Sequence, residues 1–439
     1  MAGLYIHIPF CKSRCIYCGF YSTTRMELRQ RYVDALCREM SLRPATADTI
    51  YIGGGTPSQL TTAQLRQLFA HIARNYPAAA PHGAEEVTIE MNPDDVTPAY
   101  AAALSELPVN RVSMGAQTFD DRRLRFLHRR HSASQVHEAV RLLRQAGVGN
   151  VSIDLMYGFP GETLDDWQRD IDAALALGVE HISAYCLMVE EGTVLYEQMR
   201  NEKSGMRNGD EGTRSGDERG SSGDERASSG GEGARDADEL ERLMYETLID
   251  RLTAAGYEHY EISNFARPGY RSRHNQSYWH DVPYIGLGAA AHSYDGACRS
   301  WNVSNLQQYI DAIERGELPS EREVIDADTH YNDLVATALR TSDGLSLDCL
   351  SPRHRSYCLR EARPFLDDGL LRLANSQPHA RDGQLHSSDS QLHSANGQLH
   401  SSDSQLHATS QLCPPGSRLV LTRRGLFVSD YIMSSLMFI

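Results

Sequence analysis

The sequence predicts an α/β protein, namely an open (β/α)6 partial barrel followed by a smaller α+β C-terminal domain. From residue 1 to about 190, strand-like and amphipathic helix-like segments alternate in six repeats, and such alternation is typical of a parallel sheet. Polar residues suited to chemistry fall mostly at the carboxyl ends of these predicted strands, where barrel folds form their sites. The fold class therefore places a candidate site at one edge of the sheet.

Each repeat is predicted from its own residue pattern. The strands are short runs rich in β-branched and aromatic residues, at 4–8, 49–52, 87–91, 111–115, 151–156 and 181–187. The helices between them show amphipathic spacing, at 26–42, 62–75, 132–146 and 163–177. Gly147 and Gly178 follow the last two helices, as glycines that end helices do.

Length and composition favour a globular protein of a reducing compartment. The 439 residues are 41% hydrophobic, which suffices for a large core and more than one domain. Nine cysteines occur without a recognisable signal peptide, and no apolar run is long enough to span a bilayer. We therefore expect a cytoplasmic protein with no integral membrane segment. The net charge of −15 argues against a nucleic acid partner.

Two low-complexity segments divide the chain after the barrel. We expect the barrel at 1–200 and a disordered acidic insert at 201–238, where a Gly-Asp-Glu unit recurs every seven residues without an apolar seam. A second insert at 376–416 repeats Gln-Leu-His with the same period. The second domain then comprises 239–375 and is completed by a winged-helix-like end at 417–439.

That second domain also has predicted elements. Residues 240–255 read as a helix and 256–262 as a strand, and the end of the chain reads as strand, turn at Gly425 and helix. Arg423 and Arg424 form its only local basic cluster, which argues against DNA binding by this segment.

The densest chemical signal is a trio of cysteines near the start of the chain. Cys11, Cys15 and Cys18 follow the spacing C-x3-C-x2-C directly after the first predicted strand. Three thiolates from one short loop can ligate three corners of a [4Fe–4S] cluster and leave the fourth iron open for chemistry. A structural zinc site normally takes a second pair of ligands, and no pair with that spacing follows. A disulfide or buried free thiols would also be compatible with three cysteines in this segment.

These residues and their neighbours resemble a known family. Tyr17 precedes the third cysteine, and the run from Tyr5 to Phe10 reads Tyr-Ile-His-Ile-Pro-Phe. The chain thus resembles the radical S-adenosylmethionine (SAM) superfamily, in the oxygen-independent coproporphyrinogen III oxidase-like branch that includes HemW-like heme chaperones. The resemblance implies a [4Fe–4S] cluster and SAM as cofactors, with electron transfer into SAM giving methionine and a 5′-deoxyadenosyl radical. It also implies an electron donor such as flavodoxin or ferredoxin.

By the same resemblance, residues after several predicted strands contact SAM. The run Gly-Gly-Gly-Thr-Pro at 53–57 follows the second strand, and glycines are needed where backbone approaches a ligand closely. Glu90 ends the third strand, where its carboxylate could bind a ribose hydroxyl or a substrate amine; otherwise it is a solvated acid. The residues that the resemblance assigns to SAM are Tyr5, Tyr17, Gly54, Gly55, Thr56, Glu90, Gln117, Arg129 and Asp154.

Two further features indicate which branch of the family the chain resembles. The porphyrin-oxidising members continue to a fourth cysteine two residues after the third, and here that position is Phe20. The run from His274 to Trp279 matches the HNxxYW motif that the heme chaperone branch associates with heme, which points to His274, Asn275, Tyr278 and Trp279. An imidazole can ligate heme iron, and aromatic rings can lie against a porphyrin.

Different interpretations of the heme motif stay open. His274 could instead be a hydrogen-bonded buried histidine, with Tyr278 and Trp279 in the core. His280 and His292 are candidate ligands close by in the sequence.

The favoured hypothesis is a heme chaperone that passes heme to an unknown acceptor protein, and transient contact with membrane heme proteins is compatible with it. The alternative is an oxygen-independent coproporphyrinogen III oxidase of porphyrin biosynthesis, against which Phe20 argues. A third hypothesis is a catalytically silent cluster protein whose inserts recruit partners. No catalytic residue is assigned.

Overall fold

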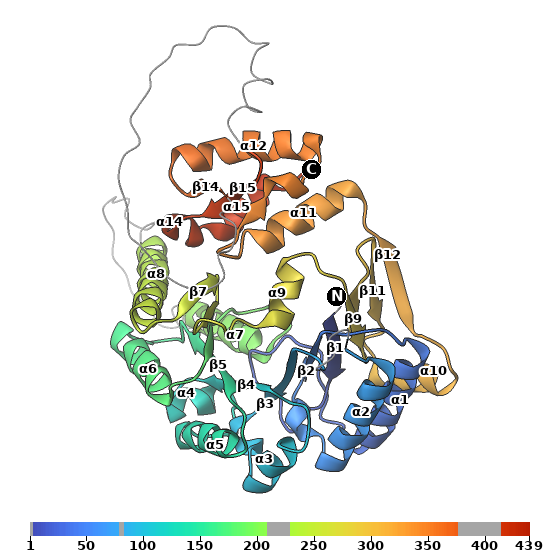
Figure 1. The fold of residues 1–439 in the computed structure, drawn as a ribbon. Coiled ribbons are helices and arrows are strands. Elements are labelled where there is room, and N and C mark those ends of the chain that lie inside the picture. The colour runs from blue at the N-terminus through green and yellow to red at the C-terminus, as the bar shows by residue number, and fades with distance from the viewer. Residues whose placement is uncertain (1–2, 79–82, 209–228, 376–413) are drawn as a thin grey trace, which may run out of the picture. The chain divides into compact units, whose positions relative to one another are not determined.

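The computed structural model describes residues 3–78, 83–208, 229–375 and 414–439 (Figure 1). It divides into two compact units, Met1–Val324 and Ile325–Ile439. Of the two predicted inserts, residues 209–228 of the first and 376–413 of the second lie outside the described ranges. Within those ranges, no helix combines the length and the apolar character needed to cross a membrane.

The first unit is built on six neighbouring parallel strands, each within a few residues of its predicted position. Each of these strands hydrogen-bonds to the next one along the chain, and every pair is parallel. The predicted α/β fold class is confirmed. The strands are β1 (Gly3–Ile8), β2 (Thr49–Gly54), β3 (Glu86–Met91), β4 (Arg111–Gln117), β5 (Asn150–Tyr157) and β6 (His181–Cys186).

Helices connect these strands and cover the outer face of the sheet (Figure 1). Local signals set their ends: Thr61 and Gln64 form a capping box at the start of α2, and Gly178 ends α6 with a φ of 64°. The connecting helices are α1 (Arg29–Leu42), α2 (Thr62–Asn75), α3 (Pro98–Leu104), α4 (Asp121–Phe126), α5 (Ala133–Gln145) and α6 (Leu164–Leu177), with short 3-10 turns at η1 (Met26–Leu28), η2 (Pro57–Gln59) and η3 (Pro93–Asp95).

The two faces of the barrel strands differ in chemistry. In β1, Leu4, Ile6 and Ile8 are fully buried, and they alternate with the polar Tyr5 and His7. Because successive side chains of a strand point to opposite faces, one face of the sheet packs as apolar core and the other carries polar groups. The same alternation recurs in β4, where apolar Val112, Met114 and Ala116 alternate with Arg111, Ser113, Gly115 and Gln117.

The sheet extends beyond the six strands at both edges. Among the described residues it has twelve strands in the order β12-β11-β10-β9-β1-β2-β3-β4-β5-β6-β8-β7. The added strands are β7 (Glu258–Glu261), β8 (Asn264–Ala266), β9 (Tyr284–Leu287), β10 (His292–Tyr294), β11 (Cys298–Asn302) and β12 (Ser320–Val324), and the added helices are α7 (Val194–Asn208), α8 (Ser229–Ala254), α9 (Arg273–Trp279) and α10 (Leu306–Glu314).

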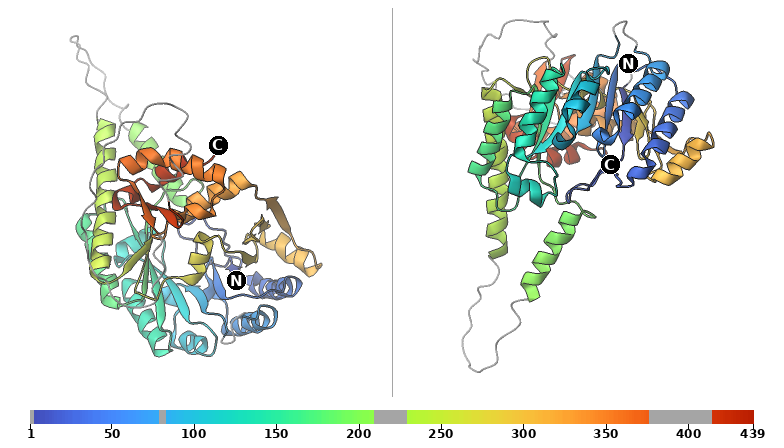
Figure 2. Two further views of the ribbon diagram at one scale, coloured as in Figure 1. Left: turned by 45° about the horizontal axis from the view of Figure 1, so that its top comes forward. Right: turned by 90° about the horizontal axis from the view of Figure 1, so that it is seen from below.

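This extension differs from the division expected from the sequence. The segment 239–324, predicted to belong to a separate domain, is part of the first unit because β9 pairs with β1 and β8 pairs with β6. Unpaired strand edges are satisfied by such additions. Helices α7 and α8 also reach into both ends of the segment 201–238, and α8 lies along α6 in Figures 1 and 2, where the Trp167 indole N–H donates to the Met244 carbonyl at 2.9 Å.

The second unit contains a three-stranded antiparallel sheet in the order β13-β15-β14. The turn predicted at Gly425 is wrong, because Gly425 lies inside helix α14, which the Thr422 side chain caps. Glycine is needed there for close packing, since a Cβ would lie 2.1 Å from the Leu370 carbonyl oxygen. The elements are α11 (Ala327–Ala338), β13 (Leu345–Ser346), η4 (Leu347–Cys349), α12 (Pro352–Asp367), β14 (Leu371–Asn375), β15 (Ser417–Leu421), α14 (Arg423–Leu426) and α15 (Ser429–Leu436).

Candidate functional site

The three cysteines lie on one irregular loop at the carboxyl end of β1. The loop is closed at its base, where the Cys11 amide donates to the Thr23 carbonyl at 2.9 Å and the Thr23 amide donates to the Pro9 carbonyl at 2.6 Å. Cys11, Cys15 and Cys18 are free thiols and are partly exposed. The loop therefore presents all three sulfurs without a helix or strand between them.

An apolar cluster fixes the middle of this cysteine loop. The Ile16 amide donates to the Leu127 carbonyl at 3.3 Å, and the Leu195 amide donates to the Ile16 carbonyl at 2.9 Å. Tyr17, expected at the SAM site, packs partly buried against this cluster. The cluster joins the loop to the ends of α4 and β5 and to the start of α7 through Ile16, Leu127, Met156, Phe159, Leu187 and Leu195.

Arg129 faces the loop with an incompletely satisfied guanidinium group. Its Nη2 donates to the Asn92 side-chain oxygen at 2.8 Å and to the Gly115 carbonyl at 2.5 Å, and its Nη1 lies 3.7 Å from the Cys15 sulfur. The buried Nε has no hydrogen-bond partner among the described residues. A buried cation beside a sulfur stabilises the thiolate form and any anionic group attached to it.

These observations bear on the expected cluster. In the part of the chain that the structure describes, no three His, Cys, Asp or Glu side chains are grouped as they would be around a single metal ion. A cuboidal cluster does not need such convergence, because each sulfur binds a different iron. Burial raises the pKa of Cys11 and of Cys18, so loading of iron would displace protons from these thiols. The free thiols and the facing Arg129 fit a thiolate-bound cluster.

Glu90 and the glycine run form a tight cradle beside this loop. The Glu90 carboxylate accepts from the Tyr51 hydroxyl at 2.7 Å and from the Gly54 amide at 2.9 Å. Gly54 has a φ of 112°, and a Cβ there would lie 2.5 Å from the His7 ring. A Cβ on Gly55 would come within 2.8 Å of backbone. Both positions thus require glycine, and Glu90 is a hydrogen-bonded group rather than a solvated acid.

Three further residues expected at the SAM site are Thr56, Gln117 and Tyr5. The Thr56 hydroxyl is buried and lies 3.4 Å from the Cys11 sulfur. Gln117 ends β4 with a φ of 67°, directly after a shift in the β4–β5 register. A positive φ is strained for a residue with a Cβ, and such positions cluster at functional sites. Tyr5 reaches the same region, because its hydroxyl lies 2.9 Å from the His7 Nδ1.

Two carboxyl groups on the polar face of the sheet have perturbed acidity. Burial raises the pKa of Glu90 to about 7, with a further increase from Asp154 and opposing effects of its hydrogen bonds. Burial likewise raises the pKa of Asp154 to about 6, while the positive charge of Arg111 opposes the increase. Perturbed carboxyl groups of this kind are typical of binding and catalytic sites.

Arg111 belongs to this polar face, and sequence reasoning missed it. It is 2% exposed, and its Nε and Nη1 have no hydrogen-bond partner within the described ranges. The signal was present in the strand alternation, because Arg111 shares its parity in β4 with Ser113 and Gly115, and Gly115 pairs with Asp154.

The motif expected to bind heme lies on α9, and His274 is fully buried there. Its Nδ1 lies 2.9 Å from the Thr49 hydroxyl, and its Nε2 lies 2.9 Å from the Tyr278 hydroxyl. Its ring also stacks on Tyr51, with 5.2 Å between centroids. Burial lowers the pKa of His274 to about 3. Both ring nitrogens are thus hydrogen-bonded within the protein, and ligation of heme iron by His274 stays a prediction.

The other motif residues also contribute packing. Tyr278 contacts Tyr284 edge to face at 4.6 Å, and Trp279 contacts Tyr260 in the same manner at 5.8 Å. The Asn275 amide donates to the capping side chain at the start of α9. These contacts help attach α9 to the sheet, and heme binding by Asn275, Tyr278 and Trp279 stays a prediction.

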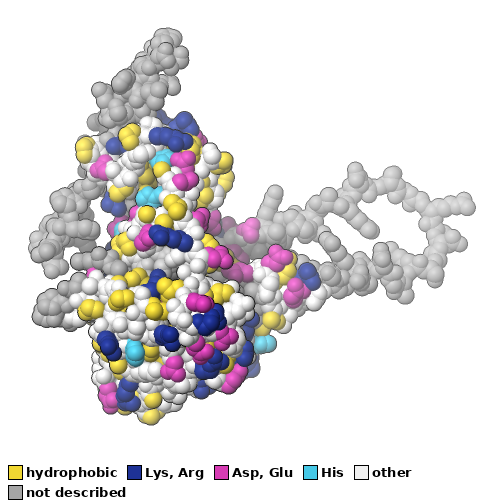
Figure 3. All heavy atoms as spheres, turned by 90° about the vertical axis from the view of Figure 1, so that its right-hand side faces the viewer, with side chains coloured by type: hydrophobic (Ala, Val, Ile, Leu, Met, Phe, Trp, Pro, Cys, Tyr) yellow, Lys and Arg dark blue, Asp and Glu magenta, His cyan; other side chains and the backbone are white. Residues whose placement is uncertain are grey.

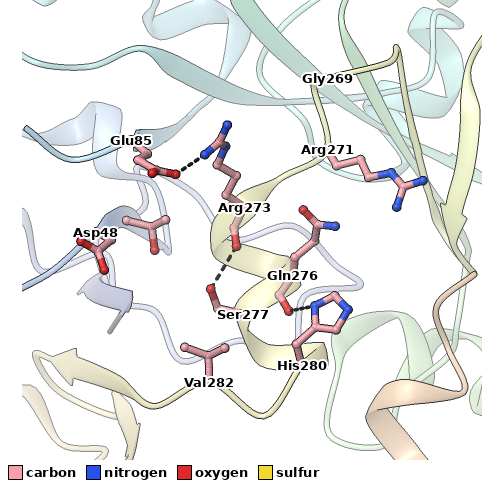
Figure 4. Close-up of a pocket in the computed structure, with 10 residues that line it drawn as sticks. Asp48, Glu85, Gly269, Arg271, Arg273, Gln276, Ser277, His280 and Val282 are labelled. Carbon is pink, nitrogen blue, oxygen red and sulfur yellow. Dashed lines mark hydrogen bonds and ion pairs between the residues drawn. The ribbon is translucent and has the colours of Figure 1, made fainter. Parts of the chain in front are cut away.

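The outer face of α9 lines a pocket of about 490 Å³. Figure 4 shows Arg273 paired with Glu85 in this wall and the His280 ring beside the backbone carbonyl of Gln276, which lies 2.9 Å from the His280 Nδ1. Arg271, also in this wall, pairs with Glu258 at 2.9 Å. His292, the second candidate ligand outside the motif, lies elsewhere, in a pocket of about 650 Å³.

Comparison with known proteins identifies the class. Residues 5–174 match the model of the Radical SAM superfamily, so the barrel and its cysteine loop define a radical SAM protein. The heme chaperone HemW of Mycobacterium tuberculosis is 35% identical over 379 residues, 84% of this chain and 88% of that protein. The heme chaperone HemW of Bacillus subtilis is 34% identical over 353 residues, 79% of this chain and 85% of that protein. The chain belongs to the HemW family of the radical SAM superfamily.

A solved structure supports the fold. Coproporphyrinogen III oxidase (HemN) from Escherichia coli has a TM-score of 0.71 with this chain at 19% identity, and the match covers 99% of this chain and 90% of that one. Membership of the superfamily implies a [4Fe–4S] cluster and SAM as cofactors.

Proposed function

We propose that this chain is a cytoplasmic radical SAM iron–sulfur protein that binds heme and transfers it to an acceptor protein. The observation that carries this proposal is the similarity to proteins named heme chaperone, which extends over 84% of the chain and is not confined to the superfamily domain at 5–174. The proposal covers heme as cargo, and the acceptor is an unidentified protein.

The cysteine loop and the cradle support the cofactor part of the proposal. Cys11, Cys15 and Cys18 would hold the cluster, with Arg129 beside it. The cluster would supply electrons for SAM chemistry, delivered by a donor such as flavodoxin or ferredoxin. The chain's own contribution is to hold SAM, for which the candidates are Tyr5, Tyr17, Gly54, Gly55, Thr56, Glu90, Gln117, Arg129 and Asp154.

The alternative activity, oxidation of coproporphyrinogen III, has weaker support. Phe20 stands where the oxidising members would have a further cysteine, and its side chain is 72% exposed beside the loop. The likeness to the oxidase structure rests on 19% identity and concerns the fold. The chaperone function is therefore the better supported of the two.

The test begins with anaerobic loading of the protein with iron, sulfide and SAM, followed by titration with heme. The proposal predicts cluster absorption, a shifted Soret band on heme addition and no release of carbon dioxide from coproporphyrinogen III. A variant with Cys11, Cys15 and Cys18 all changed to Ala is the matched control for cluster loading. An unshifted Soret band, or carbon dioxide release at many turnovers, would contradict the proposal.

A further inference from the structure

Tyr51 joins the SAM cradle to helix α9, and sequence reasoning did not single it out. Its hydroxyl donates to one oxygen of the Glu90 carboxylate at 2.7 Å, and the other oxygen accepts from the Gly54 amide at 2.9 Å. The Tyr51 ring stacks on His274, with 5.2 Å between centroids and 28° between planes. One side chain thus contacts a residue expected to bind SAM and a residue of the motif expected to bind heme.

The register of β2 and β3 explains why Tyr51 and Glu90 meet. These strands are parallel, Tyr51 pairs with Thr88, and Glu90 lies two residues beyond Thr88 on the same face. Gly53 is the next residue of β2 on that face. A Cβ on Gly53 would lie 2.7 Å from the Tyr51 ring and 3.0 Å from the Glu90 carboxyl carbon. The first glycine of the run therefore leaves the space in which the hydroxyl and the carboxylate bond.

Helix α9 is attached to the same two strands. The His274 ring is held at both nitrogens, by the Thr49 hydroxyl of β2 and the Tyr278 hydroxyl of α9, each at 2.9 Å. The buried Glu86 carboxylate of β3 accepts from the His274 amide at 3.0 Å. A buried polar network whose members are hydrogen-bonded favours one arrangement. The orientation of His274 is therefore fixed, and with it the position of the Tyr51 ring that stacks on it.

We propose that Tyr51 is a positioning residue for SAM, which orients the Glu90 carboxylate and couples it to the motif on α9. This inference rests on the cofactor part of the proposed function. Because Tyr51 and the Gly54 amide each hold one carboxylate oxygen, Glu90 is oriented before a ligand arrives, and such preorganisation lowers the cost of binding. Coupling between two sites is reciprocal, so a ligand that displaces His274 would change the affinity for SAM, and SAM would change the affinity for that ligand by the same factor.

Nearby groups set the acidity of Glu90. Burial raises its pKa, and the hydrogen bond from Tyr51 lowers it. On the side of the molecule seen in Figure 3, acidic and basic side chains are interspersed, as in the pair of Arg31 with Glu314, so that side does not act on the cradle with a field of one sign. The charged and titratable side chains that act on Glu90 come from several elements and are Tyr5 of β1, Tyr51 of β2, Arg111 of β4, Asp154 of β5 and Tyr278 of α9.

The first test is calorimetric titration of SAM into the full chain loaded anaerobically with iron and sulfide. Tyr51→Phe keeps the ring and removes the hydroxyl. It should weaken SAM binding by about tenfold, because the carboxylate loses a charge-assisted hydrogen bond. Tyr331→Phe is the matched control, since it removes a buried hydroxyl that donates to the Leu436 carbonyl at 2.8 Å in the second unit. The control should bind SAM like the wild type, and urea unfolding should show that both variants are folded.

Two further measurements separate positioning from a loss of packing. The affinity for the positively charged SAM should rise with pH as Glu90 ionises, and in Tyr51→Phe the midpoint of this rise should move to higher pH, because the bond that lowers the pKa of Glu90 is lost. A merely structural role of Tyr51 would leave the midpoint in place. Thr49→Val, which removes the hydroxyl bonded to His274, should weaken SAM binding by about threefold. Combined with Tyr51→Phe it should have less than the product of the two effects, because both act through one chain of contacts.

The outcomes distinguish this inference from the proposed function. If the wild type binds SAM and Tyr51→Phe binds it equally well with the same pH midpoint, this inference is overturned and the function stands. Effects of Thr49→Val and Tyr51→Phe that simply multiply would overturn the coupling to α9. A wild type that binds SAM but does not shift the Soret band on heme addition would contradict the proposed function alone. A wild type that binds no SAM would contradict both.

Discussion

Replacement of His274 by Ala tests whether the HNxxYW motif is structural. The substitution removes two ring hydrogen bonds, to Thr49 and Tyr278, and each is worth about 1 kcal/mol net. It also leaves a cavity under Tyr51, for which about 1–2 kcal/mol is reasonable. The total is about 3–4 kcal/mol, a large part of the stability of a typical domain.

The assay is urea unfolding of wild type and variant in the same cofactor state. With a slope of about 3 kcal/mol per molar urea, the midpoint should fall by roughly 1 M. His280→Ala, on the exposed side of α9, should change stability by less than about 0.5 kcal/mol. The fraction of His274→Ala that stays folded should still shift the Soret band. A variant with the wild-type midpoint that has lost heme binding would refute the reasoning, because His274 would then act as a ligand.

Three further predictions concern the cradle and the loop. Because the pKa of Glu90 is raised from 4.5 to about 7, the contribution of Glu90 to stability is complete below pH 4.5 and is lost as the pH rises through 7. The urea midpoint of the wild type should therefore fall between pH 4.5 and 7, and Glu90→Gln should reduce this fall. An unchanged fall in the variant would contradict the raised pKa of Glu90. Gly54→Ala should abolish SAM binding in calorimetry, because its Cβ would clash with a ring 2.5 Å away, whereas Gly161→Ala, which also has a positive φ but open space, should bind normally. Arg129→Leu should retain less iron and sulfide after anaerobic loading, because the cation beside Cys15 is lost, and full retention would show that this charge is unnecessary.

Much of the fold could be predicted because its signals are local. The six parallel strands follow from alternating segments, and Thr62–Asn75 forms α2 with the predicted bounds. The position of the domain boundary could not be predicted. Strands β9 and β8 join the sheet because the edges of β1 and β6 have unpaired backbone groups. The sequence of β9 does not indicate which edge strand it will pair with.

The candidate site, like the fold, could be predicted from the sequence only in part. The cysteine spacing and the glycine run identified the loop and the cradle because each is a short stretch whose backbone requirement is visible in its residue types. The contacts between these stretches, such as Thr56 with Cys11 and Arg129 with Cys15, join residues far apart in the chain. Family resemblance suggested Arg129, and it could not suggest Arg111, whose role depends on the polar face that it shares with Asp154.

By itself the sequence determined the parallel barrel, the cysteine loop and the need for glycine beside Glu90, because periodicity and spacing act over a few residues. The tertiary structure decided which histidine side chain is accessible to a ligand. His274 and His292 are the same residue type in neighbouring segments, but the first meets Thr49, which lies 225 positions away in the chain, and the second faces Trp301 in a pocket. Availability for a ligand depends on burial and hydrogen-bond partners, which only the folded chain brings together.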